Sequence, residues 1–209
     1  MTMVEMAVAL GLLSVVLTIF LTMLVSIQSA LSRQASRSQS NDQARLAVQE
    51  LDREIRSGNV LYNPANESDA AHFIFPNMSL RIYTQANAPT REAGGLPGER
   101  CVQWRIKYAT AATAYQLQRR EWTIGATTST AWQVVATNVM NRAVSPQKAA
   151  FAIDPAKRIV NIALLANNST QNGNTVEIDT TVEGRNTVYG DSNPCTPIAT
   201  YPTPDPAES

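Results

Sequence analysis

The sequence predicts an α+β fold in which one long N-terminal helix packs on an antiparallel β-sheet head. No charged residue occurs in residues 6–32, and no proline or glycine occurs in residues 28–57, so one helix can run through both stretches. Beyond residue 58, short stretches alternate apolar and polar side chains. The chain then divides into an apolar half of the helix (1–31), its amphipathic half (32–57), a β-rich head (58–190) and a proline-rich tail (191–209).

The apolar run of residues 6–27 is long enough to cross a membrane, because a bilayer core needs ~20 apolar residues in a helix. A secretory signal peptide is the competing interpretation. Its apolar core is usually ~7–15 residues and follows a basic region. Here the run is longer and no basic residue precedes it. Net charge is balanced, with 17 basic and 17 acidic residues, so charge alone indicates no nucleic-acid or anionic-membrane partner.

Two features of the run indicate more than an anchor. Glu5 places a carboxylate at the edge of the apolar segment, where it costs roughly 2–3 kcal/mol unless it is paired, neutralised or left in the headgroup region. Small residues recur every three or four positions and form one stripe along a helix, which lets helices approach closely in lipid. The stripe consists of Ala7, Gly11, Ser14, Thr18, Thr22 and Ser26. The alternative is a plain anchor with incidental Ser and Thr.

The second half of the helix is amphipathic. Ala44, Val48, Leu51 and Ile55 fall on one face at helical spacing, so we expect them to form the helix side of the head core. Gly58 is a stop signal, which predicts one helix of ~54 residues and ~80 Å.

The first residues, Met-Thr-Met-Val-Glu, resemble the start of a mature type IV pilin or pseudopilin, through Thr2, Glu5 and the apolar positions around them. Residues 43–56 and 182–186 look like blocks of the minor pilins of the PilW and PulJ type. The sequence departs from the family at position 1, which is Met rather than Phe. Thr22 stands where many pilins have Pro, so the helix is expected to be continuous.

The resemblance implies the type IV pilin fold and a structural subunit of a type IV pilus or secretion pseudopilus. It implies that Met1 is a processed, N-methylated end, and that Glu5 neutralises the Met1 amine of a neighbouring subunit in the filament. The implied partners are other copies or other pilins, membrane lipid before assembly, a prepilin peptidase and the pilus assembly machinery. The implied location is the cell membrane, single-pass with the head outside the cytoplasm, and then the extracellular filament.

The head is predicted to contain a sheet. Residues 102–108 alternate Val102, Trp104 and Ile106 with polar residues, the pattern of a half-buried strand. The other expected strands are residues 72–75, 80–83, 115–122, 132–139, 159–165 and 175–182. Turn-rich stretches at residues 93–98 and 167–173 separate some of them. The two cysteines, Cys101 and Cys195, suggest one disulfide in an exported protein, with a pair of free thiols as the alternative.

Catalysis is poorly supported, so we predict a protein that is not an enzyme and has no cofactor. The single histidine, His72, lies beside Phe73 and is expected to be a core or sheet-face residue, and one His with two separated Cys does not make a usual zinc site. Arg119, Arg120 and Trp122 carry a weak indication of DNA contact. The leading hypothesis is therefore a filament subunit; the alternatives are a signal-anchored extracytoplasmic protein whose head binds a ligand and, less favoured, a membrane-tethered enzyme.

Overall fold

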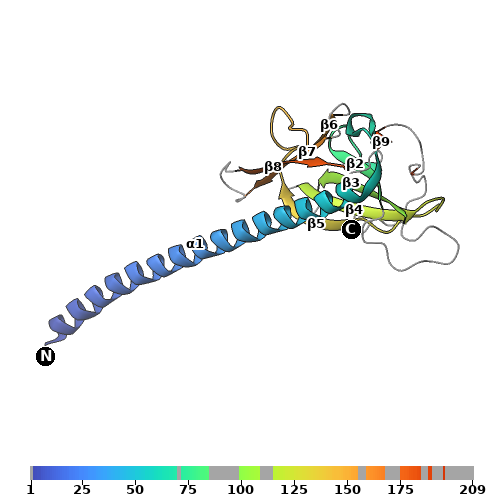
Figure 1. Ribbon diagram of the computed structural model, residues 1–209. Coiled ribbons are helices and arrows are strands. Elements are labelled where there is room, and N and C mark those ends of the chain that lie inside the picture. The colour runs from blue at the N-terminus through green and yellow to red at the C-terminus, as the bar shows by residue number, and fades with distance from the viewer. Residues whose placement is uncertain are drawn as a thin grey trace.

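The computed structural model describes residues 2–69, 72–84, 99–108, 115–154, 159–167, 175–184, 188–189 and 195. One helix is followed by strands, as the sequence predicts, and the α+β layout is confirmed (Figure 1). A short 3-10 helix, Pro64–Asn66, follows the first strand. The strands are β1 (Gly58–Leu61), β2 (Ser79–Thr84), β3 (Arg100–Tyr108), β4 (Tyr115–Thr123), β5 (Gln133–Val139), β6 (Phe151–Asp154), β7 (Ile159–Asn167), β8 (Thr175–Glu183) and β9 (Val188–Tyr189).

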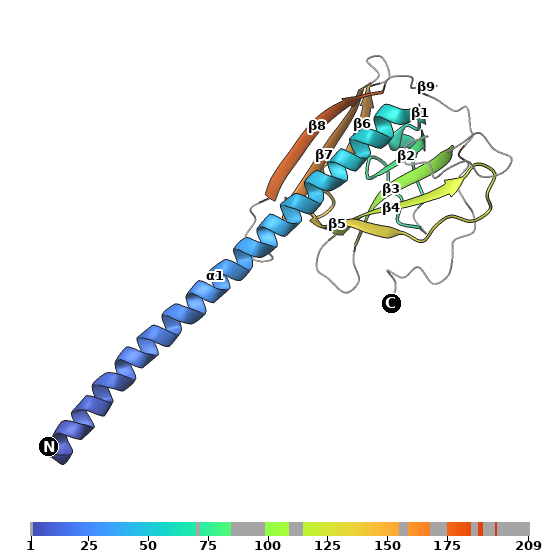
Figure 2. The ribbon, with the colours of Figure 1, turned by 60° about the horizontal axis from the view of Figure 1, so that its bottom comes forward.

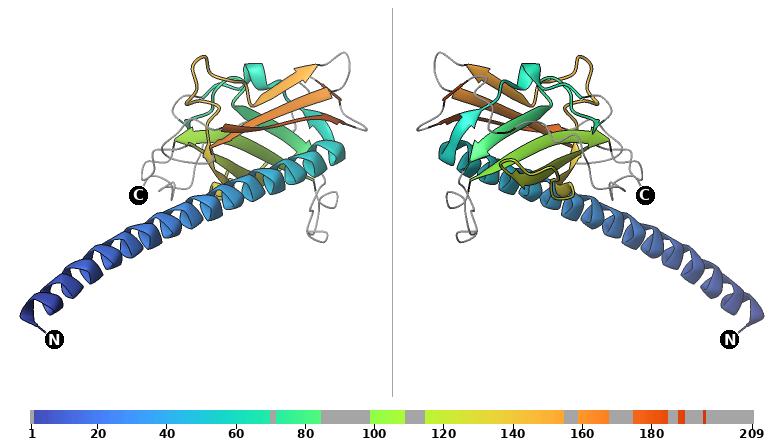
Figure 3. Two further views of the ribbon diagram at one scale, coloured as in Figure 1. Left: turned by 90° about the vertical axis from the view of Figure 1, so that its left-hand side faces the viewer. Right: turned by 90° about the vertical axis from the view of Figure 1, so that its right-hand side faces the viewer.

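Helix α1 spans Met3–Ser57, 55 residues against the ~54 expected from the residue pattern. Residues 3–39 project away from the head as a rod, and residues 40–57 lie on the sheet (Figures 1 and 2). The rod curves gently along its length (Figure 3). Gentle curvature is usual in long helices and is favoured where Ser and Thr side chains bond back to helix carbonyls.

Gly58 follows the last residue of the helix, and the space around it favours glycine. Its φ of −67° is open to any residue, so no left-handed conformation requires glycine there. A Cβ at this position would lie 3.1 Å from the Ile82 Cγ2 atom and 3.1 Å from the Ile55 carbonyl oxygen. The chain leaves the helix directly into β1, and the close approach to β2 leaves little room for a side chain.

The strands form one sheet in the order β6-β7-β5-β4-β3-β2-β1-β9, with β8 added on the outer side of β7. All described pairings are antiparallel except that of β1 with β9. The second half of α1 lies along one face of this sheet, with β7 and β8 on one side of it and β3 to β5 on the other (Figures 2 and 3). Layered packing of a helix on one sheet face is the arrangement that buries both apolar surfaces.

Strands β5 and β7 meet through a single register pair, Val139 with Ala166. Around this pair, side chains make hydrogen bonds to backbone groups that a longer strand pairing would satisfy. The buried side chain of Asn141 accepts the Leu165 N–H at 2.9 Å and donates to the Ala163 carbonyl at 2.6 Å. On the helix, Gln43 Oε1 accepts from both the N–H and the hydroxyl of Thr137, at 3.2 and 2.9 Å. Backbone groups at this junction are thereby satisfied, as buried polar groups must be.

Some sequence predictions about the head were wrong. Residues 72–75 do not form a strand: the chain turns there, with Phe73 at φ 56°, and only Ile74 makes an isolated bridge, to Asp69. The short strands β1, β6 and β9 were not predicted. The turns expected at 93–98 and 168–173, residues 185–186 of the pilin-like block, Met1, and the proline-rich tail apart from Cys195 lie outside the described residues.

Candidate assembly helix and its attachment to the head

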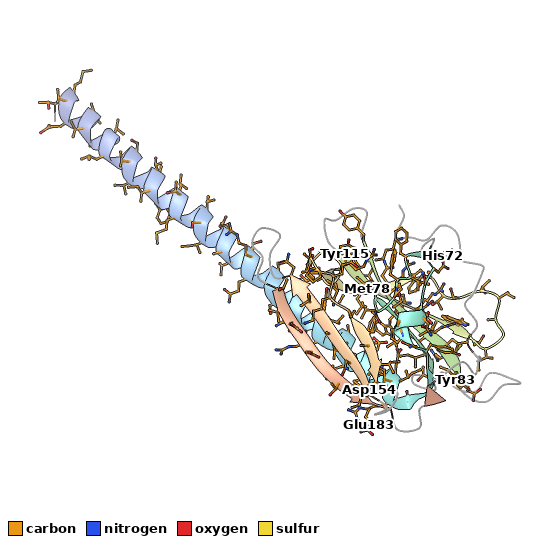
Figure 4. All side chains as sticks on the ribbon, turned by 90° about the horizontal axis from the view of Figure 1, so that it is seen from above. His72, Met78, Tyr83, Tyr115, Asp154 and Glu183 are labelled. Carbon is orange, nitrogen blue, oxygen red and sulfur yellow. A yellow bond between two sulfur atoms is a disulfide. The ribbon has the colours of Figure 1, made fainter. Side chains whose placement is uncertain are left out.

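The apolar half of α1 is exposed on every side. All side chains of residues 2–28 are exposed, and the first one buried against the head is Ser40, whose hydroxyl accepts from Asn138 Nδ2 at 2.9 Å. Side chains radiate around the whole projecting rod in Figure 4. By length and composition this helix can cross a membrane, and none of its apolar window is buried in the structure. A signal sequence would satisfy the same criteria of length and composition. So large an apolar surface needs a cover of lipid or of other helices.

Glu5 closes a capping box at the start of this helix. Its Oε2 atom accepts the Thr2 backbone N–H at 2.7 Å, and the Thr2 hydroxyl accepts the Glu5 N–H at 3.4 Å. The carboxylate also sits at the positive end of the helix dipole, which favours a negative charge. In the single chain, therefore, Glu5 has a local partner. Met1, whose amine is the partner that the resemblance implies, lies outside the described residues.

Three hydroxyls of the small-residue stripe bond to carbonyls within the helix. Ser14 donates to the Gly11 carbonyl at 2.8 Å, Thr18 to the Ser14 carbonyl at 2.7 Å, and Thr22 to the Ile19 carbonyl at 2.8 Å. Such bonds remove the cost of carrying a hydroxyl into lipid or into a helix bundle. A Cβ on Gly11 would meet nothing within 4 Å, so in the single chain this position is open.

The head side of α1 contains the expected core residues and two that were missed. Ala44, Leu51 and Ile55 are buried, and Val48 is partly buried against the same cluster. Ala47 is also fully buried. The residue pattern predicts Val48, not Ala47, as a core residue. The cluster that contains Ala47, Leu51 and Ile55 also includes residues of the sheet: Leu80, Ile82, Val102, Trp104, Ile106, Leu117, Val160, Ile162, Leu164 and Val182.

The second missed residue is Glu54, a fully buried carboxylate between helix and sheet. Its Oε2 atom accepts the Trp104 Nε1–H at 2.6 Å, and its Oε1 atom accepts the Arg119 Nε–H at 2.8 Å. Arg119 also pairs with Glu121 at 2.8 Å and with Glu50 at 3.3 Å. A buried charge is tolerated only when it is paired and hydrogen-bonded, so this cluster depends on the helix and on both strands together.

Burial and charge oppose each other in this cluster. Burial raises the pKa of Glu54 above its ordinary value and outweighs the opposing effect of Arg119. For Glu121, burial also acts to raise the pKa, but the hydrogen bonds and charges of Arg100 and Arg119 prevail and lower it. The pKa of Arg119 is raised: burial acts against its charge, and the carboxylates of Glu54 and Glu121 more than compensate.

The outer face of the sheet is also covered, contrary to the expectation of a half-buried strand. Gln103, Arg105 and Lys107 are at most 2% exposed. Trp132, in the segment before β5, lies over this face with its ring 3.8 Å from the guanidinium carbon of Arg105 and 4.5 Å from that of Arg120. Guanidinium groups stack well on aromatic rings, which makes burial of these cations feasible.

The arginines considered for DNA contact are internal. Arg120 is 1% exposed and donates two hydrogen bonds to Gln103 Oε1, and Arg119 is held by Glu54 on the helix face. Trp122 is 5% exposed. DNA contact therefore lacks the exposed side chains on which the sequence argument depended.

The predicted disulfide is present. Cys101 on β3 is bonded to Cys195, with Cα atoms 5.6 Å apart, and both residues are fully buried. Tyr62 accepts the Cys195 N–H at 3.0 Å, and Arg81 donates to the Cys195 carbonyl at 2.6 Å. The start of the C-terminal region is thus fastened to the outer face of the sheet.

His72 lies at the head surface beside the turn rather than in the core (Figure 4). Its Nδ1 atom is 2.6 Å from Asp69 Oδ2, and its carbonyl accepts from Arg105. Among the described residues, no group of three or more His, Cys, Asp or Glu side chains is placed to hold a metal ion. Comparison of the chain with protein-family models, with curated proteins and with solved structures finds no match.

Proposed function

We propose that the chain is a structural subunit of a type IV pilus or related filament, held in the membrane before assembly and polymerised through its N-terminal helix. One observation carries the proposal. Residues 3–39 form a continuous helical rod of roughly 55 Å beyond the head, apolar on all sides in its first part, with Glu5 as its only carboxylate. A plain anchor needs an apolar span but no rigid connection to its head.

The rod is connected to the head by continuous helix and by fixed contacts. Residues 28–39 remain helical, and the ends of the attached segment are fixed by Ser40 at one end and by the buried Glu54 cluster at the other. A subunit built this way transmits the position of its rod to its head. That property suits a polymer in which packed rods set the spacing of the heads.

Glu5 would set the axial register between neighbouring rods in the filament. In the apolar core of a filament, a carboxylate and an amine are each costly alone and tolerable when paired. We propose that Glu5 keeps its capping role in the membrane and pairs with the Met1 amine of a neighbouring chain on assembly. The same pairing would oppose any axial slip between neighbouring rods.

The test is to express the chain with an epitope tag in the head, in its native host, and shear the cells. The proposal predicts that the chain is recovered in sheared filaments and is labelled along them in electron micrographs. Mass spectrometry should find a processed N-terminus at Met1 with a methylated amine. A chain that stays with the membrane fraction and keeps an unprocessed precursor would contradict the proposal and favour an anchored ligand-binding protein.

A further inference from the structure

The helix between the apolar run and the head is a separate feature, here named the juxtamembrane segment (residues 28–39). It is helical throughout, and its side chains are exposed from residue 30 onward wherever they are described. Arg33 and Arg37 are the only charged residues between Glu5 and Asp42, so the segment is purely basic. Neither the core of the head nor the apolar surface of the rod accounts for the presence of these two charged residues.

The two arginines follow the apolar run closely enough for an arginine side chain to reach back toward the polar layer of a bilayer. With residues 6–27 filling a hydrocarbon core of ~30 Å, the Cα atoms of Arg33 and Arg37 lie roughly 9 and 15 Å beyond Ile27. Side chains on a helix lean toward its N-terminus, which here is the bilayer side. An arginine side chain also reaches back toward the interface while its stem covers apolar surface. Arg33 is exposed and free to do so.

We infer that the juxtamembrane segment binds the phosphate groups of anionic phospholipids while the subunit is in the membrane. A guanidinium recognises phosphate with two parallel N–H groups, and a basic residue near an anionic surface gains roughly fivefold in association. The contact would fix how deeply the rod sits and hold the head clear of the surface. It depends on the membrane anchor alone and is independent of filament formation.

The chain offers a matched control at Arg45. It is an exposed arginine on the same helix, but its Cα lies roughly 27 Å beyond Ile27. At 0.15 M salt the Debye length is ~8 Å, so Arg45 is screened from the headgroups. A lipid contact therefore predicts effects at positions 33 and 37 and none at position 45.

The experiment reconstitutes the full chain at high dilution in phosphatidylcholine vesicles containing spin-labelled phosphatidylglycerol or spin-labelled phosphatidylcholine. Electron paramagnetic resonance then gives the relative association of the two lipids with the protein. The wild type should prefer phosphatidylglycerol, and the preference should fall about fivefold in Arg33→Gln, further in the double variant with Arg37→Gln, and not at all in Arg45→Gln. It should also disappear at 1 M salt.

Equal association of both lipids with the wild type would overturn the inference. So would a loss in Arg45→Gln as large as that in Arg33→Gln. Impaired filament assembly in the double variant, with its lipid preference unchanged, would assign the arginines to a neighbouring chain instead. The inference rests on the membrane residence included in the proposed function, but dilute monomers suffice for the test, so a chain that never forms filaments still gives a decisive answer.

Discussion

The carboxylate of Glu54 accepts the indole N–H of Trp104 at 2.6 Å, which ties the last turn of α1 to the middle of β3. Arg119 from β4 bonds the other carboxylate oxygen at 2.8 Å. One buried side chain thus joins the helix to two neighbouring strands. If the rod is to set the position of the head in an assembly, this junction and the Ser40 contact with Asn138 at the other end of the attached segment make the coupling.

Glu54→Ala should destabilise the head by about 3 kcal/mol, because it leaves the Trp104 N–H and part of Arg119 buried without an acceptor. Urea unfolding of the full chain in detergent measures this, since all three tryptophans lie in the head. Asp52→Ala is the control. It removes an exposed pair with Arg56 on the same helix and should cost less than ~1 kcal/mol. Equal losses in the two variants would show that the buried cluster has no special role.

The two carboxylates that share Arg119 should respond to pH in opposite senses. Because the pKa of Glu121 is lowered by folding, its contribution to stability is present above its ordinary pKa of ~4.3 and is lost as the pH falls through the folded value. Because the pKa of Glu54 is raised, its contribution is present below that ordinary value and is lost as the pH rises through the folded value.

Both pH dependences are checked by measuring the free energy of unfolding of the wild type, Glu121→Gln and Glu54→Gln between pH 3 and 7. The advantage of the wild type over Glu121→Gln should grow with pH, and its advantage over Glu54→Gln should shrink with pH. Parallel curves for all three chains would contradict the assignment.

Gly58→Ala should destabilise the head by about 1–3 kcal/mol through overpacking against Ile82 and the helix carbonyls, since its backbone angles are ordinary. Gly11→Ala is the matched control, because a Cβ there meets nothing within 4 Å. It should leave the unfolding midpoint of the head unchanged. A Gly58→Ala chain as stable as the wild type would mean that the helix end has room to relax.

Replacing Cys101 and Cys195 by Ala should lower the free energy of unfolding by up to about 4–5 kcal/mol, since the bond closes a loop with a sequence separation of 94. Reduction of the wild type should give the same change. A non-reducing peptide map that finds the two cysteines unlinked would remove the basis for both results.

Periodicity predicted the elements that are long enough to show it. The helix and strands β2 to β5, β7 and β8 each repeat their pattern over several residues. Strands β1, β6 and β9 have four residues or fewer, and β1 follows the helix without a turn, so no local signal separates them. Residues 72–75 have strand-like composition, but the bridge from Asp69 to Ile74 turns the chain back on itself.

The buried charges were not predictable for a different reason. Glu54 lies between two core positions, and its partners are 50 and 65 residues away in sequence, on strands whose registry only the fold defines. The alternation of apolar and polar residues along β3 correctly predicted that Arg105 and Lys107 lie on the face opposite the helix. It does not reveal that Trp132 and Phe73 fold over that face and cover them.

The pairing role of Glu5 is the central claim, and incorporation of Glu5→Gln into filaments tests it most directly. Glutamine keeps the capping box, because its amide oxygen also accepts the Thr2 N–H, but it carries no charge. Sheared filaments and membranes are quantified by immunoblot from cells that express the wild type, Glu5→Gln or Glu5→Ala. We expect both variants to reach the membrane normally and to fall about tenfold or more in the filament fraction. Wild-type amounts of Glu5→Gln in filaments would contradict the account.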